Sequence, residues 1–396
     1  QMSTLLALVS KLPPHIVALS PRLQLCVGWA NMLLQRPTPA RAALDAFESA
    51  VEQCSLSTSE LRDIRIEADV LRATLECSAD HTGGLDELVA KCLSRPESMP
   101  PWLVSVAANA ATVIEIYRFD FEAARRWQQW ASPYQQQTNG PFATVYGHCL
   151  AGIAAKEELD ITEAERRFRE ALRAAKQCGG AHSHAARLAC GLLGELMYER
   201  GDVDEAERLI EESCQLGSEG GIVDFMIARY VIGARIKAMR GDRDAAARIL
   251  DDAARAAHTL GLPRLRAHVE NERMRLDLPV VVLPARAMHG EAQLGDGPRE
   301  ITAQLSDETE IRGLLAADPA LACRRAQAWV HRLRGRHRRD GRPPRGRQRR
   351  FARDVKQYTR MPQRTRVTWG NEVPARSAPV RRLQLEKLHS DVISAA

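Results

Sequence analysis

The sequence is poor in aromatic residues and in patterns that favour β-strands. Only 5% of its 396 residues are Phe, Trp or Tyr, although 45% are hydrophobic. The one β-branched run, Val280 to Leu283, lies between Pro279 and Pro284, which indicates a connecting segment and not a paired strand. This composition suits helices that pack through small residues better than an enzyme core built on a sheet.

Long apolar segments are also missing. No stretch contains 18 consecutive apolar residues, and the first residues do not form a signal peptide. We therefore expect a soluble, cytoplasmic chain with no contact to a membrane.

The nine cysteines do not form any CxxC pair, so neither a zinc site nor a disulfide framework is expected. Buried free thiols are the prediction. The nearest approach to a metal cluster is Cys178 with His182 and His184, but no fourth ligand can be identified in this glycine-rich loop. We expect no metal and no cofactor in this chain.

Catalytic motifs are absent as well. The sequence lacks a GxxxxGK[ST] phosphate loop, the glycine loop, HRD and DFG motifs of kinases, and a nucleophile elbow. The pairs Gly83-Gly84, Gly179-Gly180 and Gly220-Gly221 read as turns between helices. Glu157-Glu158 and Glu211-Glu212 are typical of solvated helix faces. We predict that this chain is not an enzyme, with no catalytic residues.

What the sequence does contain is a repeat of about 40 residues. An acidic residue recurs at 40, 42 and 40 residue steps, and each copy has an alanine four positions later. Two earlier pairs, Asp80 with Gly84 and Thr38 with Ala42, continue the series at about the same step. The four matched copies are Asp120 with Ala124, Asp160 with Ala164, Asp202 with Ala206, and Asp242 with Ala246.

Each copy has the features of a helical hairpin. Gly201 or Gly241 ends one helix with a positive φ, and the aspartate that follows can cap the next helix. Small residues twelve positions before each alanine, Gly152, Gly194 and Ala234, are expected to meet it across the hairpin. The second helices carry one apolar stripe, such as Ala206, Leu209, Ile210 and Ser213 or Ala246, Ile249, Leu250 and Ala253.

The pattern resembles the tetratricopeptide repeat (TPR), with a longer step. The phrase from Pro21 to Ala30, preceded by Leu12-Pro13-Pro14-His15, is similar to the start of the sensor region in MalT-like, LuxR-type, ATP-dependent transcriptional regulators. Similar repeats occur in the C-terminal region of PknK-like mycobacterial serine/threonine kinases. The resemblance implies an all-α fold, a right-handed superhelix of TPR-like helical hairpins.

The resemblance to MalT-like regulators implies a non-catalytic, signal-sensing and protein-interaction region of a transcriptional regulator. In this interpretation the chain is a truncated piece that lacks the ATPase and DNA-binding modules. Two alternatives remain open, the regulatory region of a PknK-like kinase and a free-standing TPR scaffold. The expected partner is a small-molecule inducer or a protein on the concave face, and self-association is possible.

The first helix of each pair should line the concave face. Transferring the TPR surface positions to this sequence predicts six ligand or partner contacts: Asn109, Tyr146, Lys156, Glu195, Tyr198 and Arg235.

The charge divides the chain unevenly. Residues 336–396 carry 17 basic and 5 acidic side chains, so the net charge of +6 belongs to this tail. We predict a TPR-like solenoid over 1–280, a linker over 281–300, a short helical segment over 301–335 and a disordered, Arg-rich tail over 336–396. The tail has three open interpretations: sequence from a shifted reading frame, a solvated linker, or an arm that contacts nucleic-acid phosphates.

Overall fold

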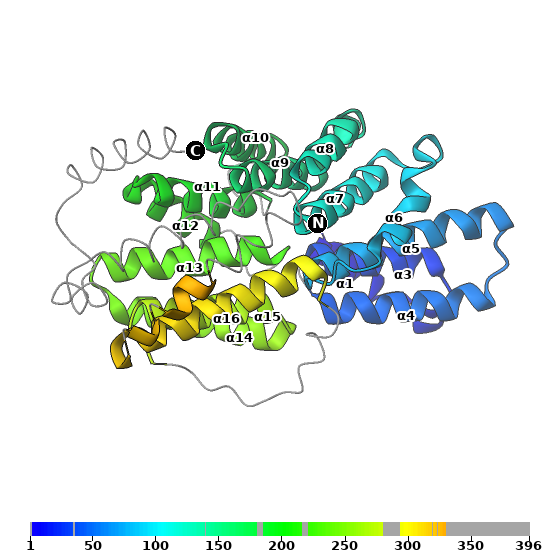
Figure 1. Ribbon diagram of the computed structural model, residues 1–396. Coiled ribbons are helices and arrows are strands. Elements are labelled where there is room, and N and C mark those ends of the chain that lie inside the picture. The colour runs from blue at the N-terminus through cyan, green and yellow to red at the C-terminus, as the bar shows by residue number, and fades with distance from the viewer. Residues whose placement is uncertain are drawn as a thin grey trace.

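The computed structural model consists of helices connected by short turns (Figure 1). It describes residues 2–34, 36–138, 140–179, 185–215, 221–279, 294–318, 320–322 and 324–329. Within these ranges there is no β-strand, which confirms the predicted all-α fold. The helices are α1 (Met2–Val9), α2 (Pro14–Ala18), α3 (Pro21–Leu33), α4 (Pro37–Gln53), α5 (Thr58–Ser78), α6 (Leu85–Leu93), the 3-10 helix η1 (Pro96–Ser98), α7 (Pro101–Arg118), α8 (Phe121–Gln136), α9 (Pro141–Glu157), α10 (Ile161–Gly179), α11 (Ala186–Arg200), α12 (Val203–Gln215), α13 (Val223–Met239), α14 (Arg243–Leu260), α15 (Pro263–Arg275) and α16 (Asp296–Ala317).

Consecutive helices form antiparallel hairpins that stack on one another. The first helices of successive hairpins, α7, α9, α11, α13 and α15, contact each other directly, and each also contacts its own second helix. The first helices are therefore buried on most sides. The second helices α8, α10, α12 and α14 bury only one face, which leaves the other face to solvent.

The four predicted caps are confirmed. Each aspartate of the series accepts a hydrogen bond from the backbone N–H three residues later, which satisfies one of the unpaired donors at a helix start. The residue before each aspartate has a positive φ and ends the preceding helix. The N–H to carboxylate distances are 2.9 Å at Asp120, 3.0 Å at Asp160, 3.4 Å at Asp202 and 2.8 Å at Asp242.

The two earlier members of the series were assigned to the wrong register. Asp80 has a φ of +63° and ends α5, so it takes the position of Gly201 and not that of Asp202. Its N–H bonds the carbonyl three residues back, as the N–H of Gly201 does. Thr38 lies inside the first turn of α4. At these two copies the next helix starts from another residue: the N-cap of α4 is Arg36 and that of α6 is Gly84.

Two of the positive-φ positions before the capping aspartates, Phe119 and Leu159, are occupied by residues that do not favour this conformation. Leu159 has a φ of +70° where the next copies have Gly201 and Gly241, and its side chain is 43% exposed. A left-handed conformation costs a non-glycine residue about 1–2 kcal/mol. Glycine avoids this steric cost, but it loses more chain entropy on folding, which offsets part of the gain. We expect Leu159→Gly to stabilise the chain by about 0.5–1 kcal/mol in urea unfolding.

The matched control for this variant is Gly201→Ala at the equivalent turn. It should destabilise the chain by about 1 kcal/mol, because alanine must then adopt the positive φ. Equal effects of the two changes would show that the turn conformation does not limit stability here.

The small residues of the first helices pack across the hairpin, but their nearest neighbours are larger side chains than the predicted alanines. A Cβ on Gly152 would overlap the ring of Phe168. One on Gly194 would press on Ile210 at 3.0 Å and would also meet the backbone oxygen of Ala206, the predicted partner, at 3.3 Å. Both larger side chains lie four residues after the alanine of the series, one helical turn further along. The alanines Ala164 and Ala206 are themselves fully buried, as expected.

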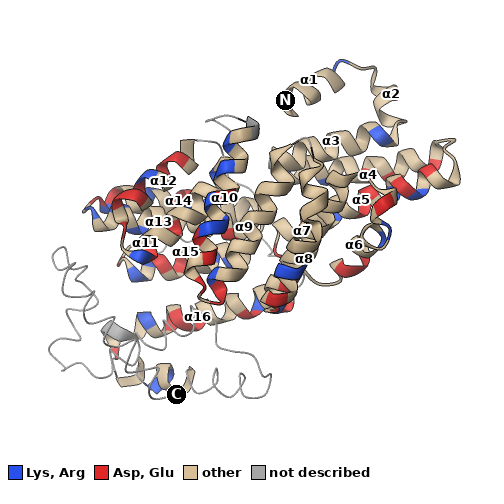
Figure 2. Ribbon diagram, turned by 90° about the horizontal axis from the view of Figure 1, so that it is seen from above, with Lys and Arg blue, Asp and Glu red and all other residues tan. Residues whose placement is uncertain are grey.

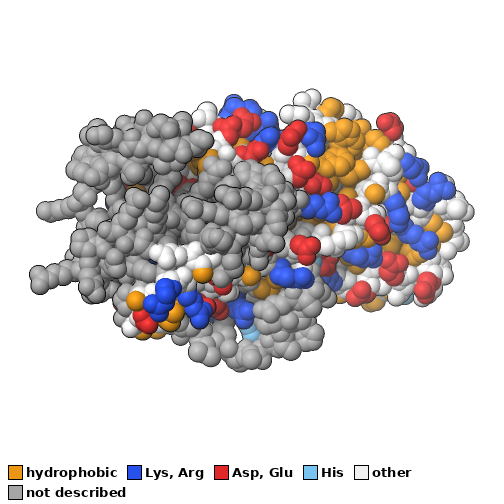
Figure 3. All heavy atoms as spheres, viewed as in Figure 1, with side chains coloured by type: hydrophobic (Ala, Val, Ile, Leu, Met, Phe, Trp, Pro, Cys, Tyr) orange, Lys and Arg blue, Asp and Glu red, His pale blue; other side chains and the backbone are white. Residues whose placement is uncertain are grey.

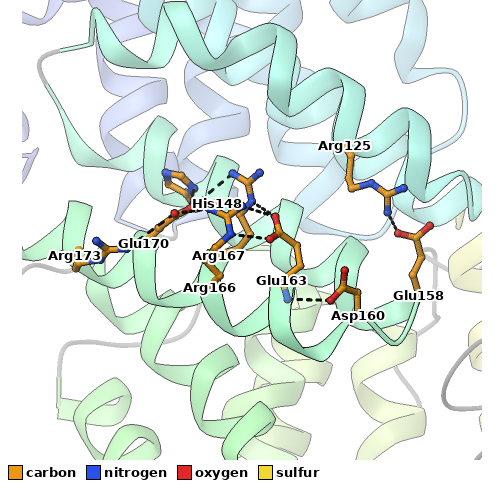
Figure 4. A network of polar contacts seen from close by, with 9 residues as sticks. All are labelled: Arg125, His148, Glu158, Asp160, Glu163, Arg166, Arg167, Glu170 and Arg173. Carbon is orange, nitrogen blue, oxygen red and sulfur yellow. Dashed lines mark hydrogen bonds and ion pairs between the residues drawn. The ribbon is translucent and has the colours of Figure 1, made fainter.

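The outer faces of the second helices carry dense ion pairs. Figure 2 shows acidic and basic residues along α10 and α12, whereas α1 and α2 contain no Lys, Arg, Asp or Glu. On α10, Arg166 contacts Glu163 and Glu170 within one helical face (Figure 4). Glu158, from one of the predicted solvated pairs, contacts Arg125 of α8. Exposed pairs of this kind contribute about 0–1 kcal/mol each, so these faces provide solubility more than stability.

The core is divided into three clusters of buried side chains. The largest extends from α5 to α13, a second joins α13 to α15, and a third packs α3, α4 and α5 together. Cys77, Cys92, Cys149 and Cys190 are buried free thiols, as predicted, and burial raises the pKa of Cys92 and of Cys190 to about 12. Such thiols stay protonated and pack as small apolar side chains.

The C-terminal part of the described chain starts with α16. This helix begins at Asp296, within the segment predicted as a linker, and ends at Ala317. Asp318 then accepts a hydrogen bond from the N–H of Leu321 at 2.9 Å and starts a second helical segment. Residues 281–293 of the predicted linker, residues 330–335 and the whole Arg-rich tail lie outside the described residues. None of the described helices is long and apolar enough to cross a membrane.

Candidate functional site

One position recurs on the inner surface of the stacked first helices, close to their C-terminal ends. It is occupied in five successive helices at steps of 39, 39, 40 and 37 residues. Because stacked repeats place equivalent residues side by side, these side chains form one row on the inner face. The row consists of Tyr117 on α7, Lys156 on α9, Glu195 on α11, Arg235 on α13 and Glu272 on α15.

Members of the row pair with the next repeat. Lys156 donates a hydrogen bond to Glu195 at 2.6 Å, and both side chains are about 15% exposed. Arg235 holds Glu272 with two hydrogen bonds, of 2.9 and 2.6 Å, and Glu272 is only 1% exposed. Burial opposes protonation of Lys156, but Glu195 and neighbouring acidic groups raise its pKa. The row is therefore a series of charged contacts that join neighbouring repeats.

A second buried cluster connects the two ends of the stack. Arg264 of α15 donates to Asp80, which follows α5, at 2.8 and 2.9 Å, and to Asp224 of α13 at 2.8 Å. The Tyr117 hydroxyl accepts from Arg264 and donates to Asp224. Asp80 and Arg264 are 184 residues apart, yet they are 0% and 2% exposed. The guanidinium thus joins α5, α7, α13 and α15 at one point.

The ionisation of this cluster follows from burial and from the arginine. Burial opposes the charge on Asp224, but Arg264 and the Tyr117 hydroxyl outweigh it and lower the pKa of Asp224 to about 2. At Asp80 burial is the larger influence and raises the pKa. Desolvation likewise raises the pKa of the Tyr117 hydroxyl well above its usual value. Arg264 is therefore a permanent cation between two carboxyl groups. Asp224 is firmly ionised, whereas burial disfavours the ionised form of Asp80.

The Arg264 cluster closes the stack of hairpins on itself. Ala79, beside Asp80, belongs to the same core cluster as residues of α13 and α15. The residues that follow α5 therefore lie against α13 and α15, although four hairpins separate α5 from α15 in the chain. On the inner face, polar side chains of different repeats pair with one another.

The repeats match a known family. A family model described as the MalT-like TPR region covers residues 66–289, which is more than half of the chain. The chain belongs to the family of MalT-like TPR regions. The matched range begins within α5 and includes the inner row and the Arg264 cluster.

Individual relatives agree with the resemblance to PknK. The serine/threonine-protein kinases PknK of Mycobacterium tuberculosis and of Mycobacterium bovis are 46% identical to this chain over 340 residues. The match covers 85% of this chain and 30% of each kinase, so the chain spans less than a third of these relatives. A crystal structure of Rap protein complexed with Competence and Sporulation Factor aligns over 90% of this chain and 91% of its own, with 14% identity and a TM-score of 0.48.

Within this MalT-like TPR region, the structure brings three of the six predicted contacts into the inner row. These are Lys156, Glu195 and Arg235. Tyr198 lies one turn beyond Glu195 on α11, partly buried against the main core cluster. Tyr146 packs edge-on against Phe225, with ring centroids 5.5 Å apart, and is thus used between repeats. A role of these residues in binding stays a prediction.

Asn109 does not reach the inner row. It is 7% exposed and donates to the backbone oxygen of Ala143 at 3.0 Å, while its own oxygen accepts from Gln128. Gln128 also donates to Thr112 at 2.7 Å. This amide network joins α7, α8 and α9, because buried amides must find hydrogen-bond partners.

Sequence reasoning missed five residues of the site. Tyr117 and Glu272 could have been found by extending the step of 39 residues from Lys156 and Glu195 in both directions. The other three, Asp80, Asp224 and Arg264, have no local pattern, since the contact among them depends on how far the stack curves.

Other site types find no support in the described residues. There, no group of three His, Cys, Asp or Glu side chains is arranged to hold a metal ion. Of the Cys178, His182 and His184 cluster considered above, His182 and His184 lie outside the described residues. On the outer surface, hydrophobic side chains gather over α7 and α8 (Figure 3), where Trp102 and Trp130 are each 37% exposed.

Proposed function

We propose that this chain is a non-catalytic regulatory region that recruits a protein partner and modulates a PknK-like serine/threonine kinase. The observation that carries the proposal is the 46% identity to PknK over 85% of the chain. The sequence itself has no kinase motif and no phosphate loop, so the catalytic step belongs to another module.

The fold supports a role in binding. A stack of hairpins presents a large surface at low cost in chain entropy, because each repeat is ordered by its neighbours. Its inner polar row and the Arg264 cluster hold the stack in one closed arrangement. A partner shifts the stack away from this arrangement only if it binds another arrangement more tightly.

A second candidate function is that of a sensor in a MalT-like transcriptional regulator, with a small-molecule inducer on the inner face. The MalT-like description of residues 66–289 favours it. Both functions use the chain as a regulatory region, and they differ in the module that it controls.

A binding and phosphorylation assay separates the two. We expect the purified chain to bind the catalytic region of mycobacterial PknK with a Kd of about 10 μM or lower and to change its autophosphorylation rate by about twofold or more. An unrelated serine/threonine kinase module is the control and should show neither effect. Absence of both effects, together with thermal stabilisation of the chain by a metabolite, would support the inducer-sensing function instead.

A further inference from the structure

Helix α16 packs against α15, as the second helices of the other hairpins pack against their first helices, but it also reaches the C-terminal end of α7 (Figure 1). Figure 2 shows it along one side of the molecule, outside the stacked hairpins. Its buried residues Leu305 and Ile311 lie outside the three core clusters, and Ile301 contacts the largest cluster only from the edge.

The contacts of α16 are of the kind that a groove makes with a bound helix. Asn271 of α15 is 5% exposed and donates to Thr309 at 3.1 Å, so a buried amide of the solenoid is satisfied by this helix. At the other end, the N–H of Gly295 donates to the carbonyl of Asp80 at 3.3 Å. A shallow hollow remains between α15 and α16, lined by Glu270, Met274, Ser306, Thr309, Glu310, Gly313 and Leu314.

The start of α16 is fitted closely to α7. A Cβ on Gly297 would overlap the backbone oxygen of Tyr117 and also its carbonyl carbon at 2.8 Å. A Cβ on Gly313, sixteen residues further along, would meet only Met274 at 3.7 Å, which is an ordinary contact. A methyl group is therefore excluded at Gly297 and accommodated at Gly313.

We propose that α15 and the C-terminal end of α7 form a helix-binding surface, which α16 occupies as an exchangeable ligand from the same chain. The occupant that this surface fits is a helix with small residues at its start, a buried face that carries Leu, Glu and Ile as Leu305, Glu308 and Ile311 do, and a hydroxyl that meets Asn271. This inference deepens the proposed function, since a partner helix of the same chemistry would replace α16 on binding.

The covalent connection between α15 and α16 explains why α16 occupies this surface. Fourteen residues, 280–293, separate the two described parts in the sequence. A short connection raises the effective concentration of α16 at its surface to the millimolar range. An external helix must compete with that concentration, so weakening α16 should make the surface available.

A labelled peptide of residues 294–318 tests the proposal on the full chain. We expect the peptide to bind Gly297→Ala, and the second variant Leu305→Asp, about 10–100-fold more tightly than the unchanged chain, as measured by fluorescence anisotropy. Leu305 is 1% exposed, so Leu305→Asp would bury a carboxylate. The cost of burying this charge displaces α16, whereas Gly297→Ala displaces it by steric overlap. Gly313→Ala is the matched control and should bind like the unchanged chain.

The remaining outcomes overturn the proposal. They are equal peptide binding by all four proteins, equally tight binding of a peptide that itself carries Leu305→Asp, or unfolding of the core clusters together with α16 in both variants. The last result would make α16 an integral part of the core. Because only this chain and its own helix are used, failure here is distinct from failure to bind a kinase.

Discussion

Replacement of Arg264 by methionine should destabilise the chain by about 3–5 kcal/mol at pH 7, because it leaves the buried Asp80 and the half-buried Asp224 without their cation. Methionine keeps most of the apolar volume, so the loss reports the charge and the hydrogen bonds. Urea unfolding followed by circular dichroism measures it. Since long repeat stacks need not unfold in one step, hydrogen exchange at α5 and α15 should show where the loss acts.

The control is Arg266→Met on the same helix, two residues away. Arg266 is 43% exposed and forms a pair with Glu270 at 3.8 Å, so its replacement should cost less than about 1 kcal/mol. Adding Asp80→Asn and Asp224→Asn to the Arg264 variant should recover part of the stability, since fewer buried charges then lack a partner. Equal costs for the two arginines would mean that the closing cluster does not hold the stack together.

The pH dependence of the Arg264 variant has a definite sign. With Arg264 present, the pKa of Asp224 is about 2, below its unfolded value, so this group stabilises the fold above about pH 4 and the benefit is lost on acidification. Arg264 is the strongest influence that lowers the pKa of either carboxyl group, so both pKa values should lie higher in the variant than in the unchanged chain. Acidification then costs the variant less than the unchanged chain, so the difference between the unchanged chain and Arg264→Met should shrink from pH 7 to pH 4.

The second large effect is expected at the hairpin of α9 and α10. Phe168 is fully buried and lies over Gly152, where the two helices approach most closely. Phe168→Ala should cost about 3–5 kcal/mol, because a fully buried aromatic ring is replaced by a cavity. Gly152→Ala should cost about 1–3 kcal/mol for the opposite reason, since its methyl group would overlap the ring.

A double variant separates these two causes. Gly152→Ala combined with Phe168→Leu should cost less than the sum of the single changes, because the smaller side chain makes room for the methyl group. The control is Arg169→Ala. Arg169 follows Phe168 in the chain and its side chain is 50% exposed, so this change should alter the free energy of unfolding in urea by less than about 1 kcal/mol. Strict additivity would show that Gly152 and Phe168 do not limit the distance between the helices.

Several features could be predicted because they depend on short stretches of chain. The caps at Asp120 to Asp242, the left-handed turns at Gly201 and Gly241, and the buried alanines each follow from residues within one turn of helix. The partner of Gly152 was predicted one turn too early. The period gives the register of a hairpin, but the packing of Phe168 decides which residues meet.

The candidate site was predicted in part for the same reason. Lys156, Glu195 and Arg235 occupy equivalent positions in successive repeats, so the repeat itself places them in one row. Asn109 belongs to a first helix as well, yet it bonds to α8 and α9 and does not join the row, because its position within the helix differs from theirs.

Capping and amphipathic periodicity act over a few residues, so the residue pattern alone predicts a stack of helical hairpins and the turns between α7 and α14. The closure of the stack through Arg264, Asp80 and Asp224, and the contacts of α16 with both α15 and α7, follow only from the three-dimensional packing. Small rotations between neighbouring repeats accumulate over the whole stack, and no local pattern encodes their sum. Contacts between residues 184 positions apart depend on that sum.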